Sequence, residues 1–192
     1  MPDLPYYGTY HHTNPEESRI IRNILRESFT EVFREIEKPS SIHLVLDAGC
    51  GLGFLSEITL KFFTEASLVG VDLFGSKSLP EGNVDLARNN MNFTGVGDRA
   101  EFVKSDLTKL NFPQNHFDMV VSNLVFHNIG QKRFLAYSRI IGMIKRGGYF
   151  VLGDFFSRSE DRKFLADQMT LMKDKGNIES MPGEYSIVLL RR

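Results

Sequence analysis

The sequence has almost no cysteine and no long apolar stretch. Cys50 is the single cysteine among 192 residues, so the chain cannot form an internal disulfide. The N-terminus has no basic stretch followed by an apolar run, as a signal peptide would. No apolar run approaches the roughly 20 residues that are needed to cross a bilayer. These absences predict a protein of the reducing cytoplasm that does not span a membrane.

The chain also lacks an excess of either charge. Its 23 Lys and Arg residues against 24 Asp and Glu residues leave a formal net charge of -1. The whole chain therefore offers no electrostatic attraction to nucleic acid or to an anionic membrane, and a nucleic-acid partner is not expected. An apolar content of 42% with 16 Phe is typical of one globular domain, which excludes a disordered chain.

The first part of the chain predicts an irregular arm followed by a helix. Residues 1–14 contain two prolines and three tyrosines without any period. Asn14 is a suitable N-cap, Pro15 suits the first helical position, and apolar residues then recur on one face. Pro39 cannot continue a helix, so we expect this one to end near Lys38.

From residue 42 onward, short apolar runs alternate with helical patterns. Helices are expected at about 53–63, 83–93 and 130–145. The runs between them are rich in Val, Leu, Ile and Phe, as strands buried on both faces should be. The alternation predicts an α/β fold with a parallel sheet and helices on both faces. The five expected strands are residues 42–47, 68–72, 100–105, 117–122 and 149–153.

The last third of the chain has a different pattern. Ser157 and Glu160 form a capping box, and apolar residues at helical spacing follow until Gly176, which is placed to end the helix. Pro182-Gly183 then predicts a turn that folds residues 177–181 back on residues 185–190 as an antiparallel hairpin. The expected total is seven strands, five of them parallel.

The most informative segment is residues 45–55, VLDAGCGLGFL. An apolar strand leads into a glycine-rich turn and then into a helix. Glycines allow the backbone to turn sharply and let a ligand approach closely, while the free N–H groups at the helix start face that ligand. Asp47 stands two positions before the first glycine, where a carboxylate would repel a pyrophosphate but attract a cationic ligand.

Carboxylates also follow the next two expected strands. Asp72 ends the second strand, where it can accept both hydrogen bonds from a ribose diol. Asp106 follows the third strand, and residues 122–123 end the fourth. Open α/β sheets bind ligands at the carboxyl ends of their parallel strands. Three acids and no basic residue at these tips predict a ligand with a positive charge, a diol and an amino-bearing base.

With these residues, the chain resembles a class I S-adenosylmethionine-dependent methyltransferase, of the branch that methylates small molecules such as quinone precursors. The resemblance covers residues 44–155 and rests on D-x-G-x-G-x-G at residues 47–53, on Asp72, on residues 105–107, and on the run from Phe112 to Asp118. It implies a three-layer Rossmann-like fold with a seven-stranded mixed sheet of order 3-2-1-4-5-7-6, strand seven being antiparallel. It also implies the cofactor S-adenosylmethionine, with S-adenosylhomocysteine as the product.

The same resemblance implies the roles of individual residues. The glycine turn and its neighbours line the methionine part, Asp72 binds the ribose hydroxyls, and Asp106 with the Leu107 backbone reads the adenine. The segment 122–124 passes under the sulfonium end. Residues 1–38 are expected to form an arm and helix that cover the cofactor site of a core at 39–192, within a single domain. The cofactor-binding candidates are Asp47, Gly49, Cys50, Gly51, Gly53, Asp72, Asp106, Leu107, Ser122, Asn123 and Leu124.

His127 is the candidate catalytic base. It lies three residues past Leu124, near the expected transfer point, and an imidazole has an ordinary pKa that suits a general base. A packing or hydrogen-bonding role is the alternative. Tyr10 and His11 in the arm are candidates for a lid or for contact with the methyl acceptor, against the alternative of a disordered tail. A metal site is not expected, because no cysteine or carboxylate cluster accompanies the arm histidines at ligand spacing.

The cysteine and the arginines of the first helix are expected to have structural rather than catalytic roles. Cys50 is a buried filler of the turn rather than a nucleophile. Three arginines on one face of the first helix, Arg19, Arg22 and Arg26, are surrounded by Glu residues and indicate a solvated surface.

The acceptor is expected to be a small molecule. Residues 123–126 are Asn-Leu-Val-Phe, which does not match the Asn/Asp-Pro-Pro-aromatic motif that resemblance implies for enzymes acting on nucleic-acid amino groups. A non-catalytic or partner-dependent S-adenosylmethionine binder remains an alternative. An NAD(P)-dependent oxidoreductase is disfavoured by Asp47 and by Phe54, which stands where the dinucleotide fingerprint has its third glycine.

Overall fold

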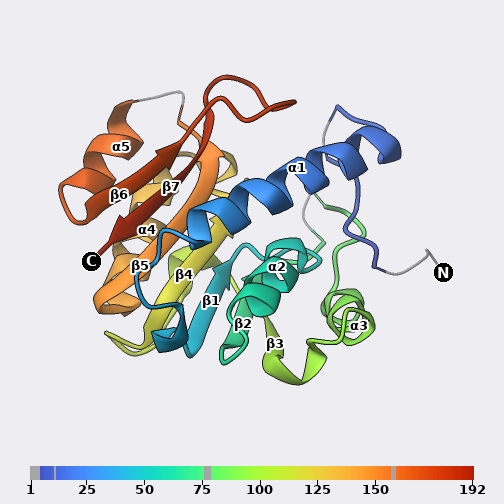
Figure 1. The fold of residues 1–192 in the computed structure, drawn as a ribbon, viewed down its shortest axis with the longest axis horizontal. Coiled ribbons are helices and arrows are strands. Elements are labelled where there is room, and N and C mark those ends of the chain that lie inside the picture. Colours follow the sequence, from blue (N-terminus) through green and yellow to red (C-terminus); the bar gives the residue numbers. More distant parts are fainter. Residues whose placement is uncertain (1–4, 11, 76–78, 157–158) are drawn as a thin grey trace.

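The computed structural model describes residues 5–10, 12–75, 79–156 and 159–192. Within these ranges the chain forms a seven-stranded sheet with the order β3-β2-β1-β4-β5-β7-β6 (Figure 1). Neighbouring strands are parallel from β3 to β5, whereas β7 is antiparallel to both β5 and β6. The predicted fold class and strand order are confirmed. The strands are β1 (Leu44–Ala48), β2 (Ser67–Asp72), β3 (Ala100–Lys104), β4 (Phe117–Asn123), β5 (Ile144–Phe155), β6 (Thr170–Lys175) and β7 (Tyr185–Arg191).

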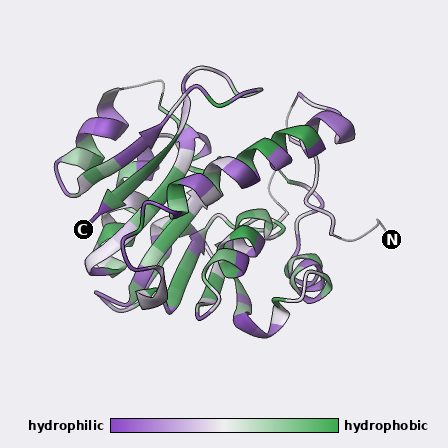
Figure 2. Cartoon of the chain, in the orientation of Figure 1, coloured by the Kyte–Doolittle hydropathy of each residue, from purple (hydrophilic) through white to green (hydrophobic). Residues whose placement is uncertain are grey.

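Helices cover both faces of this sheet and complete three layers. One apolar cluster joins the sheet to α1 (Pro15–Phe33), α2 (Phe54–Phe62) and α3 (Val84–Phe93). A second cluster, on the other face, joins it to α4 (Arg133–Met143) and α5 (Ser159–Ala166). Figure 2 shows the central strands as mostly hydrophobic, while α1 carries hydrophobic and hydrophilic residues along its length. None of the helices in the described ranges is long and apolar enough to cross a bilayer.

The first helix begins as predicted but ends earlier. The Asn14 side chain accepts a hydrogen bond from the Glu17 N–H, and the Glu17 carboxylate accepts one from the Asn14 N–H, which completes a capping box. The helix ends at Phe33 rather than near Lys38. The N–H groups of Glu35 and Ile36 donate to the carbonyls of Val32 and Phe33, three residues earlier, instead of to carbonyls four residues earlier. These tighter bonds end the α-helical ladder before Pro39 is reached.

The prediction for the last third of the chain was wrong in two places. The expected helix up to Gly176 ends at Ala166, and residues Thr170–Lys175 form the edge strand β6. The expected strand at 177–181 is part of the connection between β6 and β7, so the hairpin uses an earlier segment. Backbone pairing with β7 decides both points, because an exposed edge strand carries little apolar pattern of its own. Ser157, the predicted cap, lies outside the described residues.

Phe33 anchors α1 to the sheet and to α2. Its side chain is fully buried, and its ring lies 5.5 Å from that of Phe62 and 5.2 Å from that of Phe63. Phe33→Ala is expected to lower the free energy of unfolding by about 3–5 kcal/mol, because such a cavity refills incompletely. Urea unfolding measures this. Ile20→Ala, on the same helix but 43% exposed, should cost less than about 1 kcal/mol, and equal losses would contradict the proposed anchoring.

Candidate active site

A cavity of about 1000 Å³ lies where the central parallel strands end. Its walls come from the segments that follow β1, β2, β3 and β4, from α1, from residues 180–182, and from the arm residues Tyr7, Thr9, Tyr10, His12 and Thr13. The order of the sheet explains this position. The chain leaves β1 toward one neighbour, β2, and later returns to the other, β4, so their carboxyl ends leave a crevice.

The glycine turn after β1 is tied to the end of β2. The N–H groups of Gly49 and Cys50 donate to the Val71 carbonyl at 2.7 and 3.1 Å, and the Gly51 N–H donates to the Asp72 Oδ2 at 3.0 Å. Gly49 has a φ of 82°, and a Cβ there would overlap the Val125 side chain. Only glycine therefore fits this position, where the turn passes under the segment that follows β4.

Asp72 and Asp106 present carboxylates at the ends of β2 and β3. Asp72 also accepts a hydrogen bond on Oδ1 from the Phe74 N–H at 2.8 Å, which aims the carboxylate. Asp106 accepts from the N–H and the hydroxyl of Thr108 on one oxygen, at 2.8 and 2.7 Å. These bonds, the hydroxyl's first, hold the pKa of Asp106 below its usual range. Both side chains line the cavity, as expected for acids at neighbouring strand tips.

Asp47 is a buried carboxylate with an unsatisfied oxygen. Its Oδ2 accepts from the Ser56 hydroxyl at 2.6 Å, while its Oδ1 has no hydrogen-bond partner among the described residues. Burial raises the pKa of Asp47 to about 7, and the hydrogen bond from Ser56 only partly opposes this. An unpaired buried oxygen costs free energy unless a ligand supplies a partner. The position of this atom therefore favours a ligand that has a hydrogen-bond donor or a positive charge beside Asp47.

The end of β4 combines a buried brace with a strained turn. Ser122 is fully buried and donates to the Ala48 carbonyl at 2.6 Å, which joins β4 to β1. Asn123 accepts from the Tyr185 hydroxyl at 2.7 Å. Leu124 has a φ of 58°, which is rare for a residue with a branched side chain, and strain of this kind clusters at functional sites.

His127 is oriented by Asp154, a residue that the sequence reasoning missed. The His127 Nδ1 lies 2.6 Å from the Asp154 Oδ1, and the ring packs edge-on against Phe155. Asp154 is 2% exposed and also accepts from the N–H groups of Val125 and Phe126, so it fixes the loop that carries the histidine. A carboxylate can only accept, so in the neutral form of the ring this contact favours the tautomer with the proton on Nδ1 and the lone pair on Nε2.

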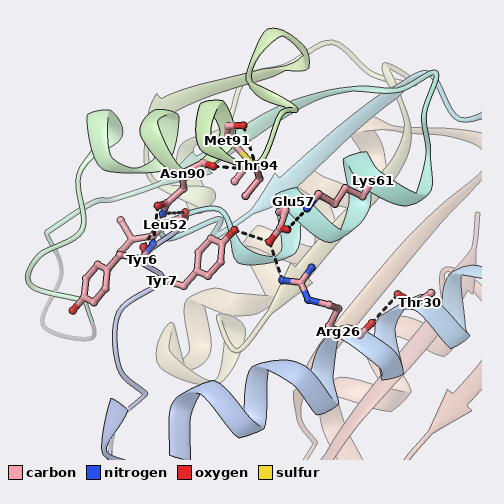
Figure 3. Close-up of polar contacts among 10 residues, drawn as sticks. All are labelled: Tyr6, Tyr7, Arg26, Thr30, Leu52, Glu57, Lys61, Asn90, Met91 and Thr94. Carbon is pink, nitrogen blue, oxygen red and sulfur yellow. Dashed lines mark hydrogen bonds and ion pairs between the residues drawn. The ribbon is translucent and has the colours of Figure 1, made fainter. Parts of the chain in front are cut away.

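The arm is fastened across the cavity by two buried side chains (Figure 3). Asn90, on α3, accepts from the Tyr6 N–H and donates to the carbonyls of both Tyr6 and Leu52, so it joins the arm to the glycine turn. The Tyr7 hydroxyl donates to Glu57 on α2 at 2.6 Å. Arg26 and Lys61 donate to the same carboxylate. Burial alone would raise the pKa of Glu57, but the three hydrogen bonds that it accepts outweigh burial and lower it.

The cavity collects most of the residues that the sequence predicted. Gly53 and Ser122 are not among the described residues that line it. Gly53 instead precedes α2 with a φ of 88°, and Ser122 braces the strands behind the wall. Tyr10 and His12 line the cavity, while His11 lies outside the described residues. The predicted cofactor residues that line the cavity are Asp47, Gly49, Cys50, Gly51, Asp72, Asp106, Leu107, Asn123 and Leu124.

Some functional candidates were not predicted from the sequence. Asn90 lies within a helical pattern, where an asparagine gives no local indication of its contacts. Asp154 ends the fifth strand, and the same attention to strand tips that found Asp72 and Asp106 would have found it. Leu73 and Leu79, from the loop after β2, also line the cavity. Among the residues described, no three His, Cys, Asp or Glu side chains gather as metal ligands would.

Comparison with known proteins places this arrangement in a family. Residues 46–152, more than half of the chain, match the family described as the methyltransferase domain. The chain belongs to this family. The match runs from β1 into β5, so it contains the glycine turn, Asp72, Asp106 and the loop with His127.

Individual relatives agree with this membership but are longer proteins. A ubiquinone/menaquinone biosynthesis C-methyltransferase from Ectopseudomonas mendocina is 32% identical over 121 residues, which cover 58% of this chain and 41% of that protein. A malonyl-[acyl-carrier protein] O-methyltransferase from Ilyobacter polytropus is 26% identical over 120 residues, covering 62% of this chain and 42% of that protein. The methyltransferase domain described here thus spans well under two thirds of the length of these curated relatives.

Solved structures share the fold over nearly the whole chain. Magnesium protoporphyrin IX methyltransferase from Synechocystis PCC 6803, solved with bound S-adenosylmethionine, has a TM-score of 0.70 at 21% identity and covers 94% of this chain and 85% of that one. A S-adenosylmethionine-dependent methyltransferase from Aquifex aeolicus has a TM-score of 0.68 at 18% identity and covers 93% of this chain and 98% of that one. The predicted resemblance to class I methyltransferases is confirmed.

The raised pKa of Asp47 predicts a pH-dependent stability for the methyltransferase domain. The unfolded carboxyl has a pKa of about 3.9, so between about pH 4 and pH 7 the folded state holds a proton that the unfolded state has lost. The contribution of Asp47 is therefore fully present below about pH 4 and is lost as the pH rises to about 7. Asp47→Asn, which mimics the protonated form, should match the wild type in thermal unfolding at low pH and exceed it at pH 8.

Asp106→Asn is the matched control, because the pKa of Asp106 is lowered. Its charged form stabilises the fold above the unfolded pKa, and this stability is lost as the pH falls through the folded pKa. The Asp106 variant should therefore melt below the wild type at pH 8, with a gap that closes on acidification. A constant gap between Asp47→Asn and the wild type from pH 5 to pH 8 would contradict the assigned titration.

Proposed function

We propose that this chain binds S-adenosylmethionine in the cavity and transfers its methyl group to a small-molecule acceptor by in-line displacement, with S-adenosylhomocysteine as the product. The observation that carries the proposal is the convergence of Asp47, Asp72, Asp106 and the glycine turn on one cavity, in a chain of the methyltransferase domain family. The near-neutral charge of the chain supports a small acceptor over a nucleic acid.

The residues present fit this cofactor. Asp72 has lone pairs left after its two backbone hydrogen bonds and is assigned to the ribose hydroxyls. Asp106 and the Leu107 backbone are assigned to the adenine. Gly49, with no room for a Cβ, shapes the wall beside the methionine part, and the unpaired Asp47 oxygen favours positive charge there. The remaining assigned contacts are Cys50, Gly51, Asn123 and Leu124.

Other parts of the chain act on the site indirectly. Gly53 starts α2 and Ser122 joins β4 to β1, so both hold the wall in place. Residues 1–38 serve as an arm and helix that cover the core at 39–192. Support for this division comes from Tyr7 and Tyr10, which line the cavity from the arm side. Exclusion of water by such a cover favours transfer over hydrolysis.

S-adenosylmethionine, when bound, supplies a methyl group that is already activated by the sulfonium leaving group. The protein must therefore position the acceptor and, for a hydroxyl or an acidic carbon, remove its proton. His127 is assigned this task. Its Nε2 carries the lone pair because Asp154 holds the proton on Nδ1, and the positive charge that forms on the ring is then balanced by the Asp154 carboxylate.

This pair favours an acceptor that needs a base. An amine or a thiol can lose its proton to solvent, whereas a hydroxyl or an acidic carbon requires a group placed to receive it. The names of two relatives, a ubiquinone/menaquinone biosynthesis C-methyltransferase and a malonyl-[acyl-carrier protein] O-methyltransferase, support a carbon or an oxygen atom as the methyl acceptor. The apolar side chains of Phe155 and Met181 on the cavity wall support an acceptor with an apolar part.

Calorimetric titration tests the cofactor assignment. The wild type should bind S-adenosylmethionine and S-adenosylhomocysteine with micromolar affinity and should not bind NAD. Asp72→Asn should weaken both by about ten- to hundredfold, because hydrogen bonds to a charged group are lost. Asp85→Asn, an equal change at an exposed carboxylate on α3, should leave affinity unchanged. Binding of NAD alone would overturn the proposal in favour of an oxidoreductase.

Turnover of an acceptor, found by screening metabolites for S-adenosylhomocysteine release, tests the base. His127→Gln should lower kcat by about 10²- to 10⁴-fold without changing affinity for S-adenosylhomocysteine. Asp154→Asn should also lower kcat, because an amide donates to Nδ1 and leaves the proton on Nε2. His116→Gln, a histidine stacked on Phe112 outside the cavity wall, is the control. Near-normal turnover by His127→Gln would exclude the base role, and cofactor binding without any product would indicate a non-catalytic binder.

A further inference from the structure

The side-chain amide of Asn123, at the end of β4, has its oxygen in the packed interior. Its Oδ1 accepts a hydrogen bond at 2.7 Å from the hydroxyl of Tyr185, a fully buried residue of β7. A Cβ on Gly153, the β5 residue paired with Asn123, would lie 2.4 Å from that hydroxyl and 3.0 Å from the Asn123 Oδ1. Only a glycine therefore leaves room for this hydrogen bond, and the amide oxygen lies among buried groups.

The amide nitrogen of Asn123 is the end that faces the arm. Both Asn123 and Tyr10 of the arm line the cavity. Burial raises the pKa of Tyr10, and a side-chain hydrogen bond with Asn123 is among the contacts that partly oppose this. A hydrogen bond lowers the pKa of a phenol when the phenol oxygen accepts, so the Asn123 amide is the donor. An amide nitrogen has two N–H groups, so it can donate one to Tyr10 and the other to a ligand.

Apolar side chains from four parts of the chain share this wall of the cavity. They are partly buried and pack against one apolar cluster: Tyr10 from the arm, Ile21 from α1, Phe155 from the end of β5 and Met181 from the connection between β6 and β7. The Phe155 ring lies 5.7 Å from the Tyr185 ring and 5.0 Å from that of His127. The support of the amide and the proposed base therefore pack against the same ring. A hydrogen-bond donor among apolar groups is strengthened by the low local dielectric.

We propose that the Asn123 amide donates a hydrogen bond to an oxygen of the acceptor that becomes negatively charged, and that Tyr185 holds the amide in the orientation this requires. The inference rests on the proposed function, in which His127 takes the proton of the acceptor. Removal of a proton from a hydroxyl, or from a carbon beside a carbonyl group, leaves negative charge on an oxygen. A donor already fixed beside that oxygen stabilises the charge as it forms. The acceptor then gives an electron pair to the methyl carbon, and the pair of the methyl–sulfur bond stays on sulfur.

The orientation of the amide also selects the class of acceptor. The N–H groups of an amine need an oxygen to accept them, but the Asn123 oxygen is bound to Tyr185 and packed against Gly153. An ionised oxygen needs donors, and the Asn123 nitrogen supplies one. The site therefore favours an apolar skeleton that carries a phenolic or enolic oxygen over an amine of the same shape. Methylation takes place on that oxygen or on the carbon that shares its charge.

Two coloured probes of the same shape test the donor. 4-Nitrophenol and 4-nitroaniline share a ring, but only the first ionises to an oxyanion. Each is titrated spectrophotometrically into protein saturated with S-adenosylhomocysteine, at a pH where the free phenol is ionised. Asn123→Ala should weaken binding of 4-nitrophenolate by about ten- to hundredfold, because a hydrogen bond to a charged group is lost. Binding of 4-nitroaniline should change by less than about twofold.

Tyr185→Phe tests the orientation, since it keeps the ring and removes only the hydroxyl. The amide can then turn and present its oxygen to the cavity. Binding of 4-nitrophenolate should fall, by less than in Asn123→Ala, while binding of 4-nitroaniline should improve. A merely structural role of Tyr185 would weaken both probes. Asn128→Ala is the matched control, because Asn128 also lines the cavity but donates to the Leu124 carbonyl at 3.4 Å, and it should change neither affinity.

Several results would overturn the inference. Equal losses of both probes in Asn123→Ala would mean that the residue only shapes the wall, and an equal loss in Asn128→Ala would assign the effect to the general polarity of the wall. No binding of 4-nitrophenolate by the wild type would exclude this class of acceptor, as would an amine found as the acceptor in the metabolite screen. Failure of the wild type to bind S-adenosylhomocysteine would instead refute the proposed function itself.

Discussion

The site depends on the hydrogen bonds that hold the glycine turn against the end of β2. Two successive N–H groups of the turn share the Val71 carbonyl, and the next glycine donates to Asp72. Strand β1, the turn and the second acidic residue thus form one rigid unit. The left-handed backbone at Gly49 and the lack of space for a Cβ make this unit specific to glycine, and they bring the turn into contact with the segment after β4.

Two charged side chains at the cavity lack the partners that would stabilise the fold. Asp47 is buried with one oxygen unpaired, and Arg22 is half-buried without a carboxylate partner in the described ranges. A fold optimised for stability alone would pair such groups or replace them. In the proposed complex, the positive charge of the cofactor complements Asp47. Function explains what stability does not.

Single buried polar side chains connect parts of the site that are distant in sequence. Asn90 binds the arm and the glycine turn together, and Asp154 binds two N–H groups of the loop after β4 as well as the ring of His127. In each case one side chain satisfies several partners, as buried polar groups must. Through these hydrogen bonds, residues on regular helices and strands hold the irregular segments around the cavity in fixed positions.

Local patterns in the sequence determined much of this protein. Apolar runs alternating with helical periods were enough to predict the parallel sheet, the helices on both of its faces, the strands that contain Asp47 and Asp72, and the strand that precedes Asp106. Burial on both faces and turn chemistry are properties of neighbouring residues, so a local pattern records them. The end of α1, the edge strand β6, the partner of His127, the anchor at Asn90 and the isolation of Arg22 were decided only by tertiary structure. Each depends on a contact between residues far apart in the chain, and no local pattern of side chains records such a contact.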